Sequence, residues 1–202
     1  MLANSKNQNL VDHLKAVSCI AQKIARICGY SDRFQKLAYF AGLLHDVGKA
    51  TKSFQDYLLT GQSDDEAILP MHHEISWAVL IKNFGSSDDN FLIFNAIYWH
   101  HARPLNGNYE YLRSRDEIIE KIKASDLKRI DRLIQSLELP DLSGVVMDKD
   151  LDVPHLFDSD RTFDKNTNAE MLAIRMCLIS ADRLVSSMSE DDAAAIAQGR
   201  VS

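Results

Sequence analysis

The sequence predicts an all-α protein, a bundle of helices around one hydrophobic core. Apolar residues recur at steps of three and four along most of the chain, which is the spacing of one helix face. The strict alternation of a half-buried strand is hard to find. The chain has 202 residues and is 46% hydrophobic, so we expect residues 1–202 to form a single domain with a sizeable core.

The first two helices follow from apolar spacing and from the residues that stop it. One helix is expected over residues 10–27, where Gly29 ends it. Its buried stripe is predicted to consist of Val17, Ile20, Ile24 and Ile27. The next helix begins after Ser31 and is expected to end near Gly48, which places His45 and Asp46 on its last turn.

The later helices are separated by glycine, proline and polar segments. They are expected over about 53–59, 72–84, 88–101, 109–123 and 125–139. The last long helix is predicted to begin with the capping box of Thr167–Glu170. Residues 141–166 before it are rich in Asp and lack periodicity, which predicts a long irregular insertion, and His155 within it is not expected to bind a metal. Residues 190–202 are expected to form a frayed tail.

Composition argues against several classes of protein. No run reaches the roughly 18 uncharged apolar residues that cross a bilayer, and the N-terminus lacks the apolar centre of a signal peptide, so we expect a cytoplasmic protein with no membrane partner. The three cysteines lie in helical patterns and are expected to be reduced core thiols. A net charge of −6 argues against a general nucleic-acid binder, although bound metal ions would still hold phosphates.

Most histidines lie at the ends or on the apolar faces of the predicted helices: His13, His45, His72, His73, His100 and His101. Asp46 adjoins His45, and Asp182 lies on the apolar stripe of the last helix, where an unpaired carboxylate is costly. Taken singly, each histidine is explained by a hydrogen bond in the core, and Asp182 by its neighbour Arg183. Taken together, these residues indicate a shared cation. Imidazole and carboxylate ligands suit Mn, Fe, Co, Ni or Zn better than Mg.

Segments spread over residues 11–187 carry a resemblance to a known family. They are, in order, "DHLKAVSCIA", "AGLLHDVGKATKSFQDYL", "HHEISWAV", "YWHHARP" and "SADRLVSS". In these segments the chain resembles the HD superfamily of metal-dependent phosphohydrolases, and more narrowly the HD nuclease of the CRISPR type I helicase-nuclease effector. The resemblance implies an HD-domain helical bundle with a metal site in its core. It also implies hydrolysis of single-stranded DNA by water activated between two divalent transition metal ions.

The resemblance also implies roles for individual residues. One ion would be held by His13, His45, Asp46 and Asp182. The other would be held by His72, His100 and His101, with Asp46 shared between the two ions. His73 stays open as an alternative to His72. Lys49 matches the lysine of the extended HD motif and is implied to neutralise phosphate charge, the alternative being a solvated lysine after a helix end. Arg103, close after the two histidines, is a candidate for binding the substrate phosphate.

No helicase motor is expected in this chain, because "GLLHDVGKA" has one residue too many between its glycines for a Walker A sequence and ends in alanine. The implied partners are therefore single-stranded DNA, a helicase component and an RNA-guided CRISPR surveillance complex. Two other functions stay open. One is an HD phosphohydrolase acting on small or cyclic nucleotides, although the chain lacks the Gly-Tyr-Pro signature of the cyclic-di-GMP enzymes. The other is a catalytically silent HD module that binds a partner.

Overall fold

The computed structural model describes residues 1–61, 71–84, 87–101, 115–139 and 165–200. Within these ranges the chain is helical, apart from turns and one isolated bridge between Leu2 and Asn9, which confirms the predicted all-α class. The helices are α1 Leu10–Ile27, α2 Asp32–Leu44, the 3₁₀ helix η1 Val47–Ala50, α3 Lys52–Thr60, α4 His72–Phe84, α5 Asp88–Trp99, α6 Arg115–Lys121, α7 Ala124–Ser136, α8 Lys165–Ser187 and α9 Glu190–Ala197. None of these helices combines the length and the apolarity needed to cross a membrane.

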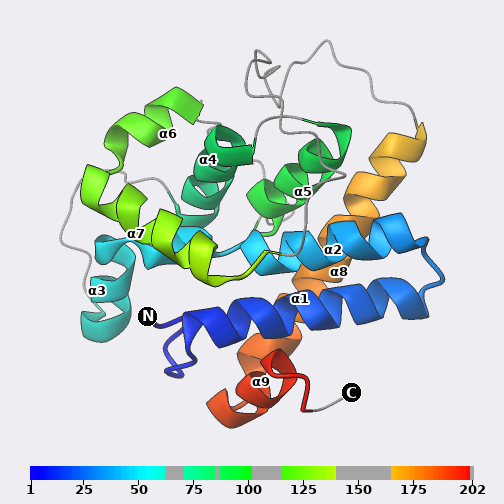
Figure 1. The fold of residues 1–202 in the computed structure, drawn as a ribbon, viewed down its shortest axis with the longest axis horizontal. Coiled ribbons are helices and arrows are strands. Elements are labelled where there is room, and N and C mark those ends of the chain that lie inside the picture. The colour runs from blue at the N-terminus through cyan, green and yellow to red at the C-terminus, as the bar shows by residue number, and fades with distance from the viewer. Residues whose placement is uncertain (62–70, 85–86, 102–114, 140–164, 201–202) are drawn as a thin grey trace, which may run out of the picture.

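Helices α1, α2 and α8 form the centre of the bundle. Figure 1 shows α1 and α2 side by side, with α8 crossing behind them and α9 against α1. Helix α5 packs on the opposite side of α2 from α1, and α4 packs against α5 and η1. The backbones of α1 and α2 nearly touch, because a β-carbon added at Gly42 would lie 2.7 Å from the α-carbon of Ser18. Only glycine permits this approach.

The buried face of α1 differs from the predicted stripe. Val17 is buried as expected, but Ile20 and Ile24 are only partly buried, and Ile27 is 74% exposed. The face turned to the core instead consists of Leu10, His13, Leu14, Val17, Ala21 and Ala25, together with Ala16 and Ser18. Small residues on this face let the neighbouring helices come close, so Ile20 and Ile24 lie at the edges of the contact and Ile27 lies outside it.

Helix α2 ends earlier than predicted. Its last residue is Leu44, His45 is its C-cap, and the chain then turns into η1 instead of continuing to Gly48. The cause is a competing hydrogen bond: the Gly48 N–H donates to the side-chain oxygen of Ser76 on α4 at 2.9 Å. In a continued α-helix that donor would bond to the carbonyl of Leu44. Because of this break, Asp46 does not take the position that it would have on a continued α2 helix.

Helix α7 supports the chain just after η1. The Arg129 guanidinium donates to the Ala50 carbonyl at 2.9 Å, and the Asp126 carboxylate accepts from the Lys52 N–H at 2.8 Å. Thr51 makes no side-chain cap for α3, so Asp126 satisfies one of the free N–H groups at the start of that helix from outside. The segment that carries Asp46 is thus held from two sides, by α4 and by α7.

Three expectations near the C-terminal half need correction or fall outside the described residues. Helix α8 begins at Lys165, so the Thr167–Glu170 box lies inside its first turns and does not start it. The expected frayed tail is wrong for residues 190–197, which form α9: Ser189 caps this helix by accepting from the Asp192 N–H, and Ala193 is buried in the core, whereas residues 201–202 lie outside the described residues. The proposed insertion lies outside the described residues except for 165–166, as do Arg103 and His155.

The three cysteines are free, as expected. Only Cys177 is buried, however, whereas Cys28 is exposed at the C-cap of α1, so the expectation of three core thiols is wrong for that residue. Cys28 is left outside because the buried face of α1 ends at Ala25, one turn earlier. None of the three belongs to the groups of ligand atoms described below.

Candidate metal centre

The histidines and aspartates singled out in the sequence converge from helices far apart along the chain. His13 lies in the first turn of α1, and Asp182 lies in the C-terminal half of α8. His45 and His100 are the C-caps of α2 and α5, and His72 begins α4. The side chains form two groups, in each of which the ligand atoms all lie within 4.8 Å of one another. The first group is His13, His45, Asp46 and Asp182, and the second is Asp46, His72, His100 and His101.

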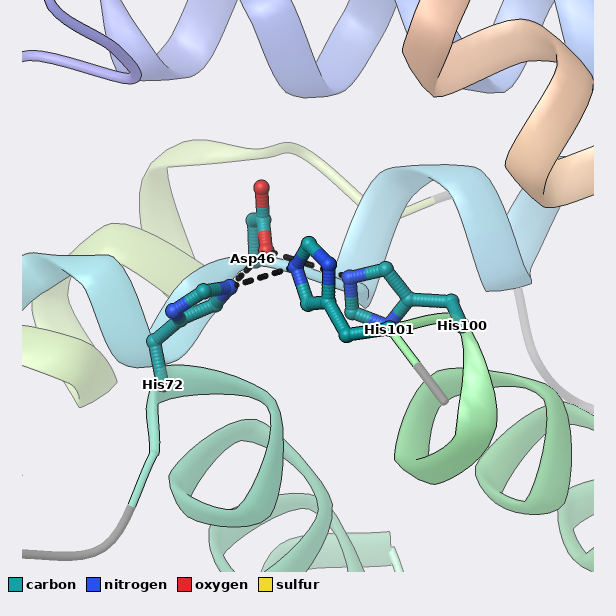
Figure 2. Close-up of side chains that lie close together, drawn as sticks. All are labelled: Asp46, His72, His100 and His101. Carbon is teal, nitrogen blue, oxygen red and sulfur yellow. Dashed lines mark hydrogen bonds and ion pairs between the residues drawn. The ribbon is translucent and has the colours of Figure 1, made fainter. Parts of the chain in front are cut away.

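Asp46 belongs to both groups, and each of its oxygens faces a different one. Its Oδ2 lies 3.1 Å from the Nε2 of His45 and 3.9 Å from the Nε2 of His13. Its Oδ1 lies 3.2 Å from the Nε2 of His72 and 3.6 Å from the Nε2 of His100. Figure 2 shows the rings of the second group directed toward the Asp46 carboxylate. Asp46 is only 1% exposed, so it bridges the two groups inside the protein.

Asp182 completes the first group from α8. Its Oδ1 lies 3.2 Å from the Nε2 of His13 and 3.6 Å from the Nε2 of His45. The first group is buried away from solvent except at Asp182, whose side chain is 18% exposed. The second group reaches the surface at His101, which is exposed. The two groups therefore differ in their access to solvent.

Backbone carbonyls orient two of the rings. The Nδ1 of His45 lies 2.8 Å from the Gly42 carbonyl oxygen, and the Nδ1 of His100 lies 2.6 Å from the Ile97 carbonyl oxygen. A carbonyl can only accept, so in both rings Nδ1 carries the hydrogen and donates. The Nε2 atoms are then directed at Asp46, which is the arrangement found when a second hydrogen bond fixes the tautomer of a metal-binding histidine.

The donor atoms fit a pair of cations. The Nε2 atoms of His13, His45 and His100 and both oxygens of Asp46 are buried, and among the described residues they make ionic contacts with one another and with Lys49 but no further hydrogen bonds. A buried polar atom left unsatisfied costs about 1–3 kcal/mol, so several in one place need a compensating ligand. Nitrogen and carboxylate oxygen without thiolate suit a first-row transition metal or zinc. The two groups are thus able to hold metal ions.

The charges in the cluster also favour cation binding. Burial acts to raise the pKa of Asp46, but His45 and Lys49 outweigh it and hold that pKa well below its usual value. Desolvation of the His101 ring where it packs against the cluster, together with the neighbouring histidines, lowers the pKa of His101 to about 3, although part of the residue is exposed. The pKa values of His13 and His72 are also lowered, mainly by burial. Most rings are therefore neutral, and the carboxylate is ionised, as ligands must be.

His45 is the exception among the rings. Burial acts to lower its pKa, but the Asp46 and Asp182 carboxylates together raise it to about 10. Without a bound cation His45 is therefore protonated at neutral pH. Its Nδ1 already donates to Gly42, so the additional proton lies on Nε2, the atom that faces Asp46. A metal ion has to displace that proton to bind.

Lys49 is part of the centre. Its ammonium nitrogen lies 2.5 Å from the Asp46 Oδ2 and 5.7 Å from the centre of the Phe54 ring, and the residue is only 9% exposed. The alternative of a solvated lysine after a helix end is therefore wrong. In this structure the ammonium, together with the protonated His45 ring, offsets the charge of the buried Asp46 carboxylate.

His72, not His73, is the histidine directed at Asp46. The His72 Nε2 lies 3.2 Å from the Asp46 Oδ1 and 2.8 Å from the Nε2 of His101. The His73 ring packs against the rings of His72, His100, His101 and Tyr98 and belongs to neither group. Burial, with the charges of the neighbouring histidines, lowers the pKa of His73 to about 2. The structure thus assigns His73 a packing contact beside the second group.

Two residues near the centre were not singled out from the sequence as site residues. Ser76 was noted only for its spacing from His72, yet its hydroxyl donates to the His72 carbonyl and accepts from the Gly48 N–H. Gln8 was missed altogether, although it contacts His13 from the N-terminal segment. The polar stretch around Gln8 shows no helical period, so no local signal marks it as buried. Such contacts arise only when distant segments pack together.

Comparisons with known proteins identify similar sequences. A family model described as "HD domain" matches residues 10–134, which include every candidate ligand except Asp182. The chain is 26% identical over 155 residues to the "CRISPR-associated endonuclease Cas3-HD" of Methanocaldococcus jannaschii, and the match covers 66% of this chain and 61% of that relative. The chain thus aligns with about three fifths of the relative's length. No solved structure matches significantly.

Proposed function

Because the chain belongs to the HD domain family, we propose that it is a metal-dependent nuclease that hydrolyses phosphodiester bonds of single-stranded DNA in CRISPR interference. The observation that carries the proposal is Asp46, whose two oxygens face two separate groups of imidazoles inside the protein. A shared carboxylate of this kind suits a pair of ions acting on one phosphodiester. The similarity to a protein named as a CRISPR-associated endonuclease supports a nucleic-acid substrate.

The residues of the two groups would hold one ion each. The first ion would be held by His13, His45, Asp46 and Asp182, and the second by Asp46, His72, His100 and His101. The chemistry that two such ions supply is a water activated as nucleophile near neutral pH and stabilisation of the leaving oxygen. The protein then needs no nucleophile of its own. Asp46 orients the two halves of the site relative to each other.

Lys49 has a separate role in this proposal. Its ammonium neutralises Asp46 in the ion-free protein, at 2.5 Å from Oδ2. Cations bound on both sides of Asp46 would remove the need for that ion pair. The ammonium would then be available to a phosphate oxygen, where it offsets the charge that develops during hydrolysis. Lys49 and Asp46 are therefore the residues proposed to be catalytic.

The substrate would approach from the side of the second group. His101 is exposed there, whereas His13, His45 and His100 are buried. A phosphodiester approaching from this side would first meet His101, whose ring belongs with Asp46 to the second group. Arg103 follows two residues later in the sequence and stays the candidate for a phosphate contact, although it lies outside the described residues.

The proposed partners follow from the same assignment. Single-stranded DNA has to be made available to such a nuclease by a helicase, either as a separate subunit or as another part of the same polypeptide. We therefore propose a helicase component and an RNA-guided CRISPR surveillance complex as partners. The relative in Methanocaldococcus jannaschii carries the name of a CRISPR-associated endonuclease, which supports this context.

The test combines metal analysis with cleavage. The protein is purified, its metal content is measured, and it is reloaded with Mn²⁺, Co²⁺, Ni²⁺, Zn²⁺ or Mg²⁺ before incubation with single-stranded DNA and, separately, with a panel of linear and cyclic nucleotides. We expect about two ions per chain and cleavage of the DNA. Hydrolysis of nucleotides alone would favour the small-molecule phosphohydrolase, and fewer than one ion per chain would favour a silent binding module.

The matched variant is Asp46→Ala. Its cleavage activity should be lost, because one carboxylate serves both groups, while the circular dichroism spectrum stays helical. Asp182→Ala provides the comparison, since it changes the first group only. Retained activity of Asp46→Ala would reject the arrangement of two ions around one carboxylate.

A further inference from the structure

Gln8 is a fully buried amide that joins the start of the chain to two parts of the candidate metal centre. The side chain is 0% exposed. Its Nε2 donates to the backbone carbonyls of Val185 and Met188, each at 2.9 Å. Its Oε1 accepts from the Asn4 amide at 2.8 Å and lies 3.1 Å from the Nδ1 of His13. Each hydrogen-bonding position of the amide is thus occupied.

The two carbonyls decide which way the amide of Gln8 faces. Val185 lies in the last turn of α8 and Met188 directly follows that helix, and the Val185 carbonyl also accepts from the Met188 N–H at 3.0 Å. A carbonyl oxygen only accepts, so the atom of Gln8 that faces both of them has to be the NH₂ group. The oxygen of the amide therefore faces His13. If the oxygen and the NH₂ group of the Gln8 amide exchanged places, the oxygen would face the carbonyl oxygens of Val185 and Met188, and neither contact would be a hydrogen bond.

The orientation of Gln8 in turn decides the tautomer of His13. An amide oxygen can only accept, so the Nδ1 of His13 carries the hydrogen and donates to Gln8. The Nε2 then has its lone pair directed at the Asp182 Oδ1, 3.2 Å away, and at the Asp46 Oδ2, 3.9 Å away. Without Gln8 the nearby Asp182 carboxylate would attract the hydrogen to Nε2 instead. A ring in that tautomer cannot bind a metal through Nε2.

We propose that Gln8 is a positioning residue that holds His13 in the Nδ1–H tautomer and so prepares its Nε2 as a metal ligand. The inference rests on the proposed function only in that it takes His13 as a ligand of the first group. Gln8 also caps the end of α8, the helix that carries Asp182, and thereby ties the position of that carboxylate to the orientation of the His13 ring. For His45 and His100 a backbone carbonyl in the preceding turn has the same task.

The test has two parts. Long-range ¹H–¹⁵N correlation spectra of the metal-free wild-type protein near pH 8 identify the protonated nitrogen of His13, which we expect to be Nδ1. In Gln8→Leu the hydrogen should move to Nε2. Titration with Co²⁺, followed by its visible absorption, should show that one of two binding events weakens by roughly 10- to 100-fold in the variant, as for other residues that orient a metal-binding histidine.

Gln55→Leu is the matched control. Gln55 is also a buried amide that ties the N-terminal segment to the core, through the backbone of Leu2 and the Lys49 carbonyl, but it contacts no candidate ligand. We expect both Co²⁺ affinities and the His13 tautomer to be unchanged in it.

A His13 ring protonated at Nε2 in the metal-free wild type would overturn the proposal. A Gln8→Leu variant that binds Co²⁺ in both events with wild-type affinity would overturn it as well. The spectrum of the wild-type protein tests the His13 tautomer even if the Gln8→Leu variant does not fold. A wild type with an Nδ1–H tautomer that binds no Co²⁺ would reject the proposed function while leaving the orientation of His13 by Gln8 in place.

Discussion

The backbone of Gly48 runs directly against the carbonyl of His72, so that a β-carbon added at Gly48 would lie 2.1 Å from the His72 oxygen. The Ser76 hydroxyl joins the two residues, since it accepts from the Gly48 N–H and donates to the His72 carbonyl, both at 2.9 Å. This contact fixes the start of α4 relative to η1. It therefore sets the distance between Asp46, just before η1, and His72, the first residue of α4.

Gly48→Ala should disrupt the second group of ligands. The added methyl group has no room, so α4 has to move, and we expect a loss of about 3 kcal/mol or more in the free energy of unfolding. Ser76→Ala should cost less, about 1–3 kcal/mol, because it leaves the buried Gly48 N–H without an acceptor but adds no clash. Denaturant unfolding and metal content measure both effects. A Gly48→Ala protein with wild-type stability and metal content would show that this contact does not set the site.

His72 and His73 should respond differently to substitution. His72→Ala is expected to lose about one ion per chain and most of the cleavage activity, because its Nε2 faces Asp46. His73→Phe is expected to keep the metal content, since the ring only packs against its neighbours and a phenyl ring fills similar space. Metal analysis of the two purified variants is the measurement. The reverse pattern would assign the ligand to His73.

Lys49→Met should separate catalysis from metal binding. We expect cleavage to fall by about 10²-fold, the usual effect of removing one charged group that stabilises the transition state. The metal should bind at least as tightly as in the wild type, because the ammonium no longer competes for Asp46. Lys52→Met is the control, as that lysine is exposed and pairs with Asp56. Equal activity of Lys49→Met and the wild type would remove Lys49 from the mechanism.

Metal affinity should rise with pH. The pKa of His45 is raised to about 10 in the ion-free protein. Protonation of His45 therefore stabilises the ion-free fold. This contribution is complete at pH values below the ordinary histidine pKa of 6.5 and is lost as the pH rises through about 10. An ion in the first group has to displace this proton. Its apparent affinity should therefore increase by up to about tenfold per pH unit between pH 7 and 9.

The proton can be counted directly. Calorimetric titration of the ion in buffers with different ionisation enthalpies should show about one proton released per ion bound in the first group. His101 should add no further proton in this range, because its pKa is lowered to about 3. An affinity that does not depend on pH would mean that His45 is neutral in the ion-free protein.

Local pattern predicted much of the helical structure. The bounds of α1 and α4 agree with the predicted ranges, because the apolar spacing is regular there and, for α1, Gly29 follows its end. The break after Leu44 could not be predicted in this way, since the competing partner of the Gly48 N–H is a serine on another helix. The capped α9 had a local signal in Ser189 and the acidic turn after it, and the prediction of a frayed tail overlooked that signal.

For the candidate site, too, some features were predicted from the sequence and others were decided only by the tertiary structure. The sequence alone determined which residue types are present, namely histidines at helix ends beside aspartates, and these residue types already indicated a metal site. Tertiary structure alone decided that Asp46 faces both groups, that His72 and not His73 is directed at it, and that Lys49 is buried. It also decided that Gln8 orients His13. The physical reason is that apolar spacing and local caps specify most of a helix from its own sequence, whereas the break after Leu44 and the direction of each side chain depend on how separate helices pack against one another.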